Sequence, residues 1–124
     1  SFQEALDKND RYVDAITGLG WAQCALGFYD KALDTLNRSL AIKDDQSDAH
    51  FGMGWTYYNM GRYDDAEGGF RRAIEISPND SGNYYWLGLT LEQLGRTDEA
   101  VDAYRDALAK GNQFAQAELD RLGK

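Results

Sequence analysis

The stretch that decides the fold runs from residue 47 to residue 80 and reads SDAHFGMGWTYYNMGRYDDAEGGFRRAIEISPND. Numbered from 1 to 34, it has small residues at positions 8 and 20 and large apolar residues at positions 7, 11 and 24. A glycine, Gly61, separates two segments whose apolar residues recur with a helical period. The spacing predicts two amphipathic helices, over 48–60 and 64–76, joined by a tight turn. The residues that carry the pattern are Gly54 and Ala66, Met53, Tyr57 and Phe70, then Ala73 at position 27 and Pro78 at position 32.

The same pattern recurs 34 residues earlier and 34 residues later, without an insertion or deletion. Three small positions carry the recurrence, namely position 8, the turn at position 15 and position 20. It divides the chain into three units, 13–46, 47–80 and 81–114. The recurring residues are Gly20, Gly54 and Gly88, then Gly27, Gly61 and Gly95, then Ala32, Ala66 and Ala100.

This 34-residue pattern resembles the tetratricopeptide repeat (TPR). The resemblance implies an all-α fold, a right-handed superhelical stack of antiparallel helix pairs with about eight helices. The chain departs from the pattern at His50, which takes a bulky apolar position, and at Gln23, which takes an aromatic one. The first and third units also lack the proline of the second. These departures affect local packing and not the expected fold.

Both ends of the chain continue the register. Phe2 and Ala5 fall at positions 24 and 27 of a preceding unit, so we expect residues 1–12 to be the second half of an incomplete repeat within a longer protein. Asn9 and Asp10 are expected to form the turn after it. Residues 115–124 are expected to form a C-terminal capping helix, because a repeat stack must cover its terminal apolar face.

Two packing questions concern small residues. Positions 8 and 20 are both small, so we expect them to meet between the two helices of a unit. Gly68 and Gly69 lie in the middle of a predicted helix, where glycine costs about 1 kcal/mol relative to alanine. They either admit a close neighbour or are tolerated on the outer face. We favour the outer face.

Positions 2, 5, 9 and 12 of each first helix form a separate stripe. By resemblance to the family, this stripe lines an inner, concave wall where TPR proteins hold an extended or helical peptide. Each ring on it either contacts a partner or packs between adjacent units, and packing is given most weight for Trp21 and Trp86. The candidate peptide-binding residues are Asp14, Thr17, Trp21, Asp48, Phe51, Trp55, Tyr58, Tyr85, Leu89 and Glu92.

Charge narrows the class of partner. The three first helices, over 13–26, 48–60 and 83–94, contain none of the 13 Lys and Arg residues. Family members that grip a C-terminal carboxylate place basic residues on this wall, so the resemblance implies that such a clamp is absent here. A net charge of -8 argues against nucleic acid and anionic membrane surfaces. The expected ligand is an apolar, neutral-to-basic peptide or helix.

The sequence gives little support for a catalytic or metal-binding function. His50 is the single histidine and is expected to pack in the core, and Cys24 has no activating neighbour in the sequence. The acidic residues Asp44, Asp45 and Asp48 lack the spacing and the glycine of a calcium loop. We therefore expect no enzyme activity, no cofactor and no metal site.

The sequence as a whole predicts a non-catalytic scaffold or adaptor that binds a protein or peptide. Two alternatives stay open, a self-association module that makes a homo-oligomer and the regulatory arm of a larger enzyme. No segment has the roughly 20 consecutive apolar residues of a membrane span, so no direct membrane contact is expected. The compartment is unknown, and a single cysteine gives only a slight preference for the cytoplasm.

Overall fold

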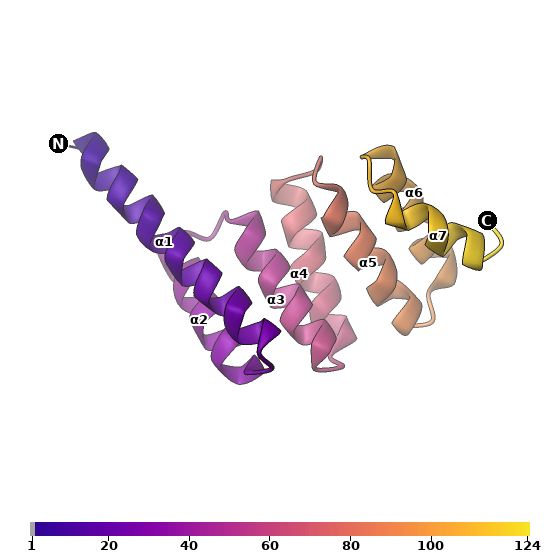
Figure 1. Ribbon diagram of the computed structural model, residues 1–124, viewed down its shortest axis with the longest axis horizontal. Helices are drawn as coiled ribbons and strands as arrows, with labels where there is room; N and C mark the ends of the chain where they lie inside the picture. The colour runs from indigo at the N-terminus through magenta and orange to yellow at the C-terminus, as the bar shows by residue number, and fades with distance from the viewer. Residues whose placement is uncertain (1) are drawn as a thin grey trace.

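The computed structural model describes residues 2–124, with side chains from residue 8 onward. In this part of the chain there are seven α-helices and no strand. The helices pair antiparallel and stack in chain order, so the predicted all-α stack of helix pairs is confirmed (Figure 1). The helices are α1 (Phe2–Ala25), α2 (Tyr29–Ile42), α3 (Ser47–Asn59), α4 (Tyr63–Ile76), α5 (Ser81–Gln93), α6 (Thr97–Ala109) and α7 (Phe114–Arg121).

The turn expected at Asn9 and Asp10 is wrong, because α1 runs unbroken from Phe2 to Ala25. This accounts for seven helices where about eight were expected. Residues 1–17 contain neither glycine nor proline, so nothing there favours the positive φ that ends a helix. The N-terminal half of α1 consequently projects beyond α2 (Figure 1).

Each tight turn within a unit is built on a glycine with positive φ. At the first of them, Gly27 has φ 86°, and its N–H donates to the Cys24 carbonyl at 3.0 Å. The N–H of Phe28 donates to the Gln23 carbonyl at 2.8 Å, which completes a helix-ending pair of hydrogen bonds. Gly61 and Gly95 repeat this geometry with φ 79° and 77°. The turn glycine therefore sets the antiparallel pairing of every unit.

The glycine at position 8 of each unit lies against the side chain at position 24 of the same unit. A Cβ added at Gly54 would lie 3.0 Å from the Phe70 ring, and one added at Gly88 would lie 2.6 Å from the Tyr104 ring. The register did not predict this contact with position 24, and the contact between positions 8 and 20 stays a prediction. Glycine is needed at position 8 because it receives a large side chain from the second helix.

Gly68 and Gly69 face different surroundings. A Cβ added at Gly68 would have nothing within 4 Å, as the outer-face prediction requires. A Cβ added at Gly69 would lie 2.7 Å from the backbone nitrogen of Gly54 and 2.9 Å from the carbonyl oxygen of His50. The prediction is wrong for Gly69, where the backbones of α3 and α4 approach closely.

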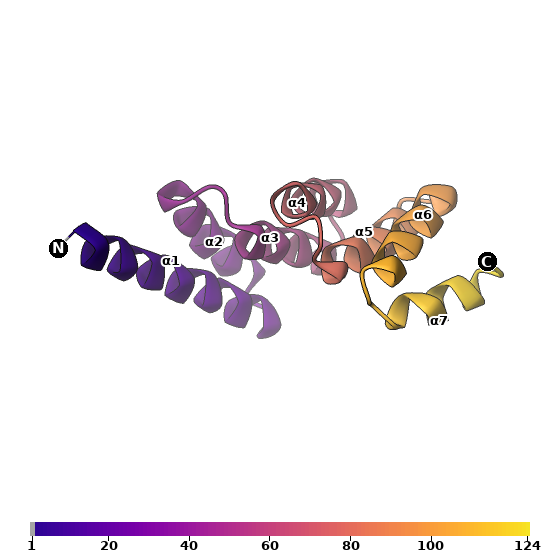
Figure 2. The ribbon, with the colours of Figure 1, turned by 90° about the horizontal axis from the view of Figure 1, so that it is seen from above.

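The helices form two rows. Figure 2 shows α1, α3, α5 and α7 along one side of the stack and α2, α4 and α6 along the other. The first row is bowed, with α1 and α7 projecting past α3 and α5; we call its surface the inner face. Ala115 and Leu119 of α7 are buried in the same core cluster as Leu87 and Val101. None of the helices in residues 2–124 combines the length and the apolar character that a bilayer crossing needs.

Candidate interaction surface

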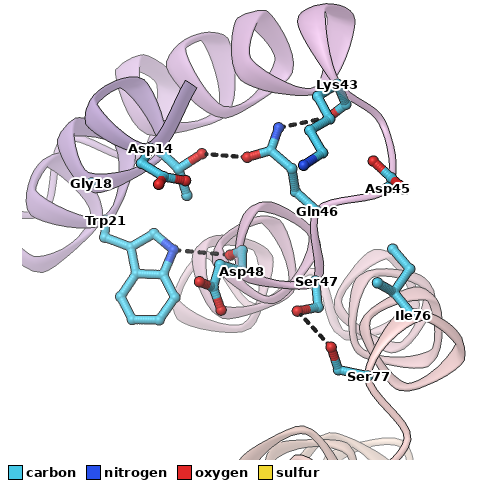
Figure 3. Close-up of a pocket in the computed structure, with 11 residues that line it drawn as sticks. Asp14, Gly18, Trp21, Lys43, Asp45, Gln46, Ser47, Asp48, Ile76 and Ser77 are labelled. Carbon is cyan, nitrogen blue, oxygen red and sulfur yellow. Dashed lines mark hydrogen bonds between the residues drawn. The ribbon is translucent and has the colours of Figure 1, made fainter. Parts of the chain in front are cut away.

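An open pocket of about 550 Å³ lies on the inner face beside the start of α3 (Figure 3). It is bounded by α1, by the connection from α2 to α3 and by the end of α4. Four of the ten predicted residues line it, namely Asp14, Thr17, Trp21 and Asp48. The other lining residues are Gly18, Lys43, Asp45, Gln46, Ser47, Ile76 and Ser77.

The indole of Trp21 forms one wall of the pocket and joins α1 to α3. Its Nε1–H donates to the carbonyl oxygen of Asp48 at 3.0 Å (Figure 3). A Cβ added at Gly52 would lie 2.7 Å from Nε1, so a glycine is required for the ring to approach. The ring centroid lies 5.3 Å from that of Phe51 and 6.1 Å from that of Trp55. Trp21 therefore packs between two units and also presents a fixed aromatic surface.

The rim of the pocket carries an excess of negative charge. Asp14, Asp45 and Asp48 are exposed, and within residues 8–124 none of them forms an ion pair. The one basic side chain in the lining is that of Lys43, whose ammonium lies 3.9 Å from the Asp10 carboxylate. The rim can therefore attract a cationic group.

Thr17 is occupied within the fold. It is 7% exposed, and its hydroxyl lies 2.7 Å from the Ser39 hydroxyl and 3.0 Å from the Gln46 side-chain oxygen. The Gln46 amide in turn donates to the Lys43 carbonyl at 2.6 Å. Thr17 therefore holds the connection that bounds the pocket, and its hydroxyl is not available to a partner.

Half-buried aromatic rings continue from the pocket along the inner face. Phe51, Trp55 and Tyr58 lie on α3, and Tyr85 lies on α5. Trp86 packs between the second and third units, with ring centroids 6.3 Å from Phe51, 5.4 Å from Tyr58 and 6.4 Å from Tyr85. Leu89 is half-buried against the same core. The ring contacts form an unbroken series through Trp21, Phe51, Trp86, Tyr85 and Phe114.

Glu92, at the far end of the inner face, already has partners. Arg121 of α7 donates to both of its carboxylate oxygens, at 2.5 Å and 2.7 Å, and the Tyr104 hydroxyl donates at 2.7 Å. Burial on its own would raise the pKa of Glu92, but the hydrogen bonds from Arg121 and Tyr104 outweigh it and hold the pKa below the ordinary value. The absence of Lys and Arg from the three first helices predicts an inner face without cations. This prediction is wrong at this end of the face, where Arg121 lies, and at the pocket, which Lys43 lines.

The low pKa of Glu92 predicts a loss of stability in acid. A carboxyl whose pKa is lower in the folded state stabilises the fold above its unfolded pKa, which is about 4.3 for glutamate. That contribution is lost as the pH falls from about 4.3 through the lower folded pKa. We expect the urea midpoint of the Glu92→Gln variant to change less between pH 7 and pH 3.5 than that of the unmodified chain. Parallel pH profiles for the two proteins would contradict this prediction.

The remaining polar candidates are held by local contacts. His50 is half-buried, and its Nε2 lies 2.9 Å from the Asp44 carbonyl, so it is not the core residue expected. Cys24 is buried, and the Asn59 side-chain amide donates to its sulfur at 3.5 Å. Within the described side chains, no group of three or more His, Cys, Asp and Glu residues could hold a metal ion.

Sequence reasoning missed the pocket residues that lie between helix pairs, among them Lys43, Gln46 and Ser77. The repeat register carries no spatial information for these connections, where the three units differ in sequence. It also missed Arg121, which lies in α7 beyond the three units. Arg121 could have been noticed in the sequence, because it is the one basic residue of the expected closing helix before Lys124.

The chain is similar to a known protein family and to several solved structures. The family model described as tetratricopeptide repeat matches residues 18–81 and again residues 51–115. A crystal structure of MamA is 32% identical with a TM-score of 0.76, covering 84% of this chain and 61% of that chain. The chain thus spans about three fifths of the length of that protein. Among curated protein sequences, none matches significantly.

Two further solved structures share the fold at lower identity. The first TPR of Spaghetti (RPAP3), bound to the HSP90 peptide SRMEEVD, is 18% identical with a TM-score of 0.84 and 90% coverage of both chains. PcrH, in complex with the chaperone binding region of PopB, is 17% identical with a TM-score of 0.80, covering 90% of this chain and 94% of that chain. At these identities the similarity concerns the fold alone.

Proposed function

Because the chain belongs to the tetratricopeptide-repeat family, we propose that it is a non-catalytic scaffold or adaptor that binds a partner peptide or helix across its inner face. The observation that carries the proposal is the pocket beside Trp21, where unpaired carboxylates adjoin a row of half-buried rings. The Spaghetti domain holds an HSP90 peptide and PcrH holds a region of PopB, which supports a binding role for a stack of this shape.

The chemistry of the surface favours an apolar ligand with basic residues. Trp21, Trp55 and Tyr85 offer large, rigid apolar areas that lose little side-chain entropy on binding. Asp14 and Asp48 are exposed at the rim and can pair with a lysine or arginine of the ligand. Thr17 and Glu92 already have partners within the chain. The contacts with a partner are therefore expected from the rings and the aspartates.

We expect this preference to appear as a difference in affinity between two matched peptides. One is an amphipathic helical peptide with three lysines on its polar side, and the other carries glutamates at the same places. By calorimetry the lysine peptide should bind at least about tenfold more tightly, and the difference should shrink as salt is added. SRMEEVD is an acidic probe that should bind no better than the glutamate peptide. Equal affinities for the two helical peptides, or no binding by either, would remove the basis of the proposal.

Variants can assign the binding to this surface. Trp55→Ala should weaken binding of the lysine peptide while leaving the helical circular dichroism nearly unchanged. Asp14→Asn combined with Asp48→Asn should reduce the preference for lysine. The matched control combines Asp34→Asn with Asp106→Asn, because these exposed carboxylates lie on the other row and change the net charge equally. If both double variants reduced the preference for lysine equally, that preference would come from the net negative charge of the whole protein and not from a site.

A further inference from the structure

The pocket beside Trp21 has the charge to hold a cation. Three exposed carboxylates line it, and the one basic group in its lining is the ammonium of Lys43. That ammonium lies 3.9 Å from the carboxylate of Asp10, which does not line the pocket. Three carboxylates against one ammonium leave an excess of two negative charges, so a positively charged group is attracted into the pocket. The carboxylates are those of Asp14, Asp45 and Asp48.

The pocket lies at the junction between the first and second units, both of which the structure describes in full. A neighbouring first helix does not cover the place that Asp14 occupies. Asp48 takes that place on α3, and it remains exposed although α1 packs beside α3. Trp21 turns toward the second unit, since its contacts with Phe51 and Trp55 lie on α3. The groups that line the pocket therefore stay open within a continuous stack of units.

The indole of Trp21 gives the pocket a flat wall in a fixed orientation. The Asp48 carbonyl accepts from its Nε1–H, and Phe51 and Trp55 contact the ring from the side of α3. The ring is half-buried, so part of its surface is open to the pocket. Figure 3 views the indole face-on, with Asp14 above it and Asp48 to one side. A flat cation that enters here can stack on the ring and direct its donors toward both carboxylates.

The next junction along the stack lacks this combination of groups. The tryptophan recurs there as Trp55, but a glycine and an asparagine replace two of the three aspartates. The pocket with its aromatic wall and its three carboxylates is therefore a property of the first junction and not of every junction in the fold. The replacements are Gly82 for Asp48 and Asn79 for Asp45.

We propose that this pocket binds the side chain of one arginine of the partner. The guanidinium lies flat on the indole of Trp21, and its N–H groups donate to the carboxylates of Asp14 and Asp48. The inference rests on the proposed function, because the arginine belongs to the peptide or helix that binds the inner face. It adds that one basic residue, at one position of the ligand, is recognised by its shape as well as by its charge.

The shape of the pocket lining favours arginine over lysine. A guanidinium is planar and carries its N–H donors in the same plane, so it can stack on a ring and pair with a carboxylate at the same time. A lysine ammonium is compact and strongly hydrated, and it has no flat face to match the indole of Trp21. Lysine therefore keeps the attraction of the carboxylates but loses the stacking. Because the two side chains carry the same charge, a difference in affinity between them reports the contact with the ring.

Peptides with a single arginine test this preference. Each is the lysine peptide with a different one of its three lysines replaced by arginine. By calorimetry one of these peptides should bind at least about fivefold more tightly than the lysine peptide, and the other two should stay within about twofold of it. Citrulline in place of that arginine, which is planar but uncharged, should abolish the gain.

The outcomes separate this inference from the proposed function. No gain from arginine at any place, or the same gain at all three places, would overturn the arginine pocket, and the preference for lysine over glutamate would still support the proposed function. A gain that citrulline preserves would also overturn it, because the carboxylates would then play no part. No binding by any of the peptides would overturn both proposals together.

Gly18 allows the pocket to be filled without a change of charge. It lines the pocket, and a Cβ added there would have nothing within 4 Å. Gly18→Leu should therefore keep the helical circular dichroism and remove the gain from arginine. Gly68→Leu is the matched control and should keep the gain, because Gly68 has equally open surroundings within α4 but does not line this pocket. A gain that survives Gly18→Leu, or that is lost in both variants, would contradict the assignment of the arginine to this pocket.

Discussion

Replacing Gly69 by alanine is expected to destabilise the fold by about 2–3 kcal/mol, although alanine is the better helix former. The added Cβ would lie 2.7 Å from the nitrogen and 2.9 Å from the Cα of Gly54, and 2.9 Å from the carbonyl oxygen of His50. These are backbone atoms and cannot rotate away. Relief requires α3 and α4 to separate, which loosens the packing of the core between them.

The adjacent Gly68 supplies the control for this prediction. A Cβ added there would have nothing within 4 Å, so Gly68→Ala should gain about 0.5–1 kcal/mol from helix propensity alone. Urea denaturation followed by circular dichroism would measure both variants against the unmodified chain. Two neighbouring glycines should thus respond to the same substitution with opposite signs. A gain in both variants would show that α3 and α4 are farther apart than the structure has them.

Phe70→Ala is expected to cost about 3–5 kcal/mol, the largest loss among the single substitutions considered. Phe70 is fully buried, and its ring fills the space left by Gly54. Its centroid lies 5.5 Å from that of Phe51 and 6.3 Å from that of Trp86, on which it stacks. Truncation therefore leaves a cavity inside one unit and also weakens the joint with the next unit.

Phe114→Ala provides the matched comparison, because Phe114 is 75% exposed and its removal leaves no cavity. Its cost should stay within about 0.5 kcal/mol. Chemical denaturation at one temperature would measure both variants. Similar losses for Phe70→Ala and Phe114→Ala would contradict the assignment of Phe70 to the core.

The repeat register predicted the helix pairs correctly because steric requirements fix its key positions. Gly61 needs a positive φ, and Gly54 must receive the ring of Phe70, so few other residues fit either place. The turn at Asn9 and Asp10 rested on residue preference alone, and a preference without a glycine did not end the helix. The role of Gly69 could not be read from the register, because it depends on how closely two helix backbones approach.

The candidate surface was predictable in part. Asp14 and Trp21 lie seven residues apart on one side of α1, and Asp48 stands at the place equivalent to Asp14 on the neighbouring first helix. The register could not show that the Thr17 hydroxyl bonds to Ser39 and Gln46, since a stripe position does not reveal what lies beneath it. Nor could it show the pairing of Glu92 with Arg121, which joins residues 29 apart across the last unit boundary.

The series of rings from Trp21 to Phe114 has a mechanical consequence. Within this series, the rings of neighbouring units meet edge to face or at a tilt. A ligand side chain inserted between two such rings would have to separate neighbouring units. We therefore expect binding at a junction to change the fluorescence of Trp21 or Trp86, whose indoles lie at the two junctions.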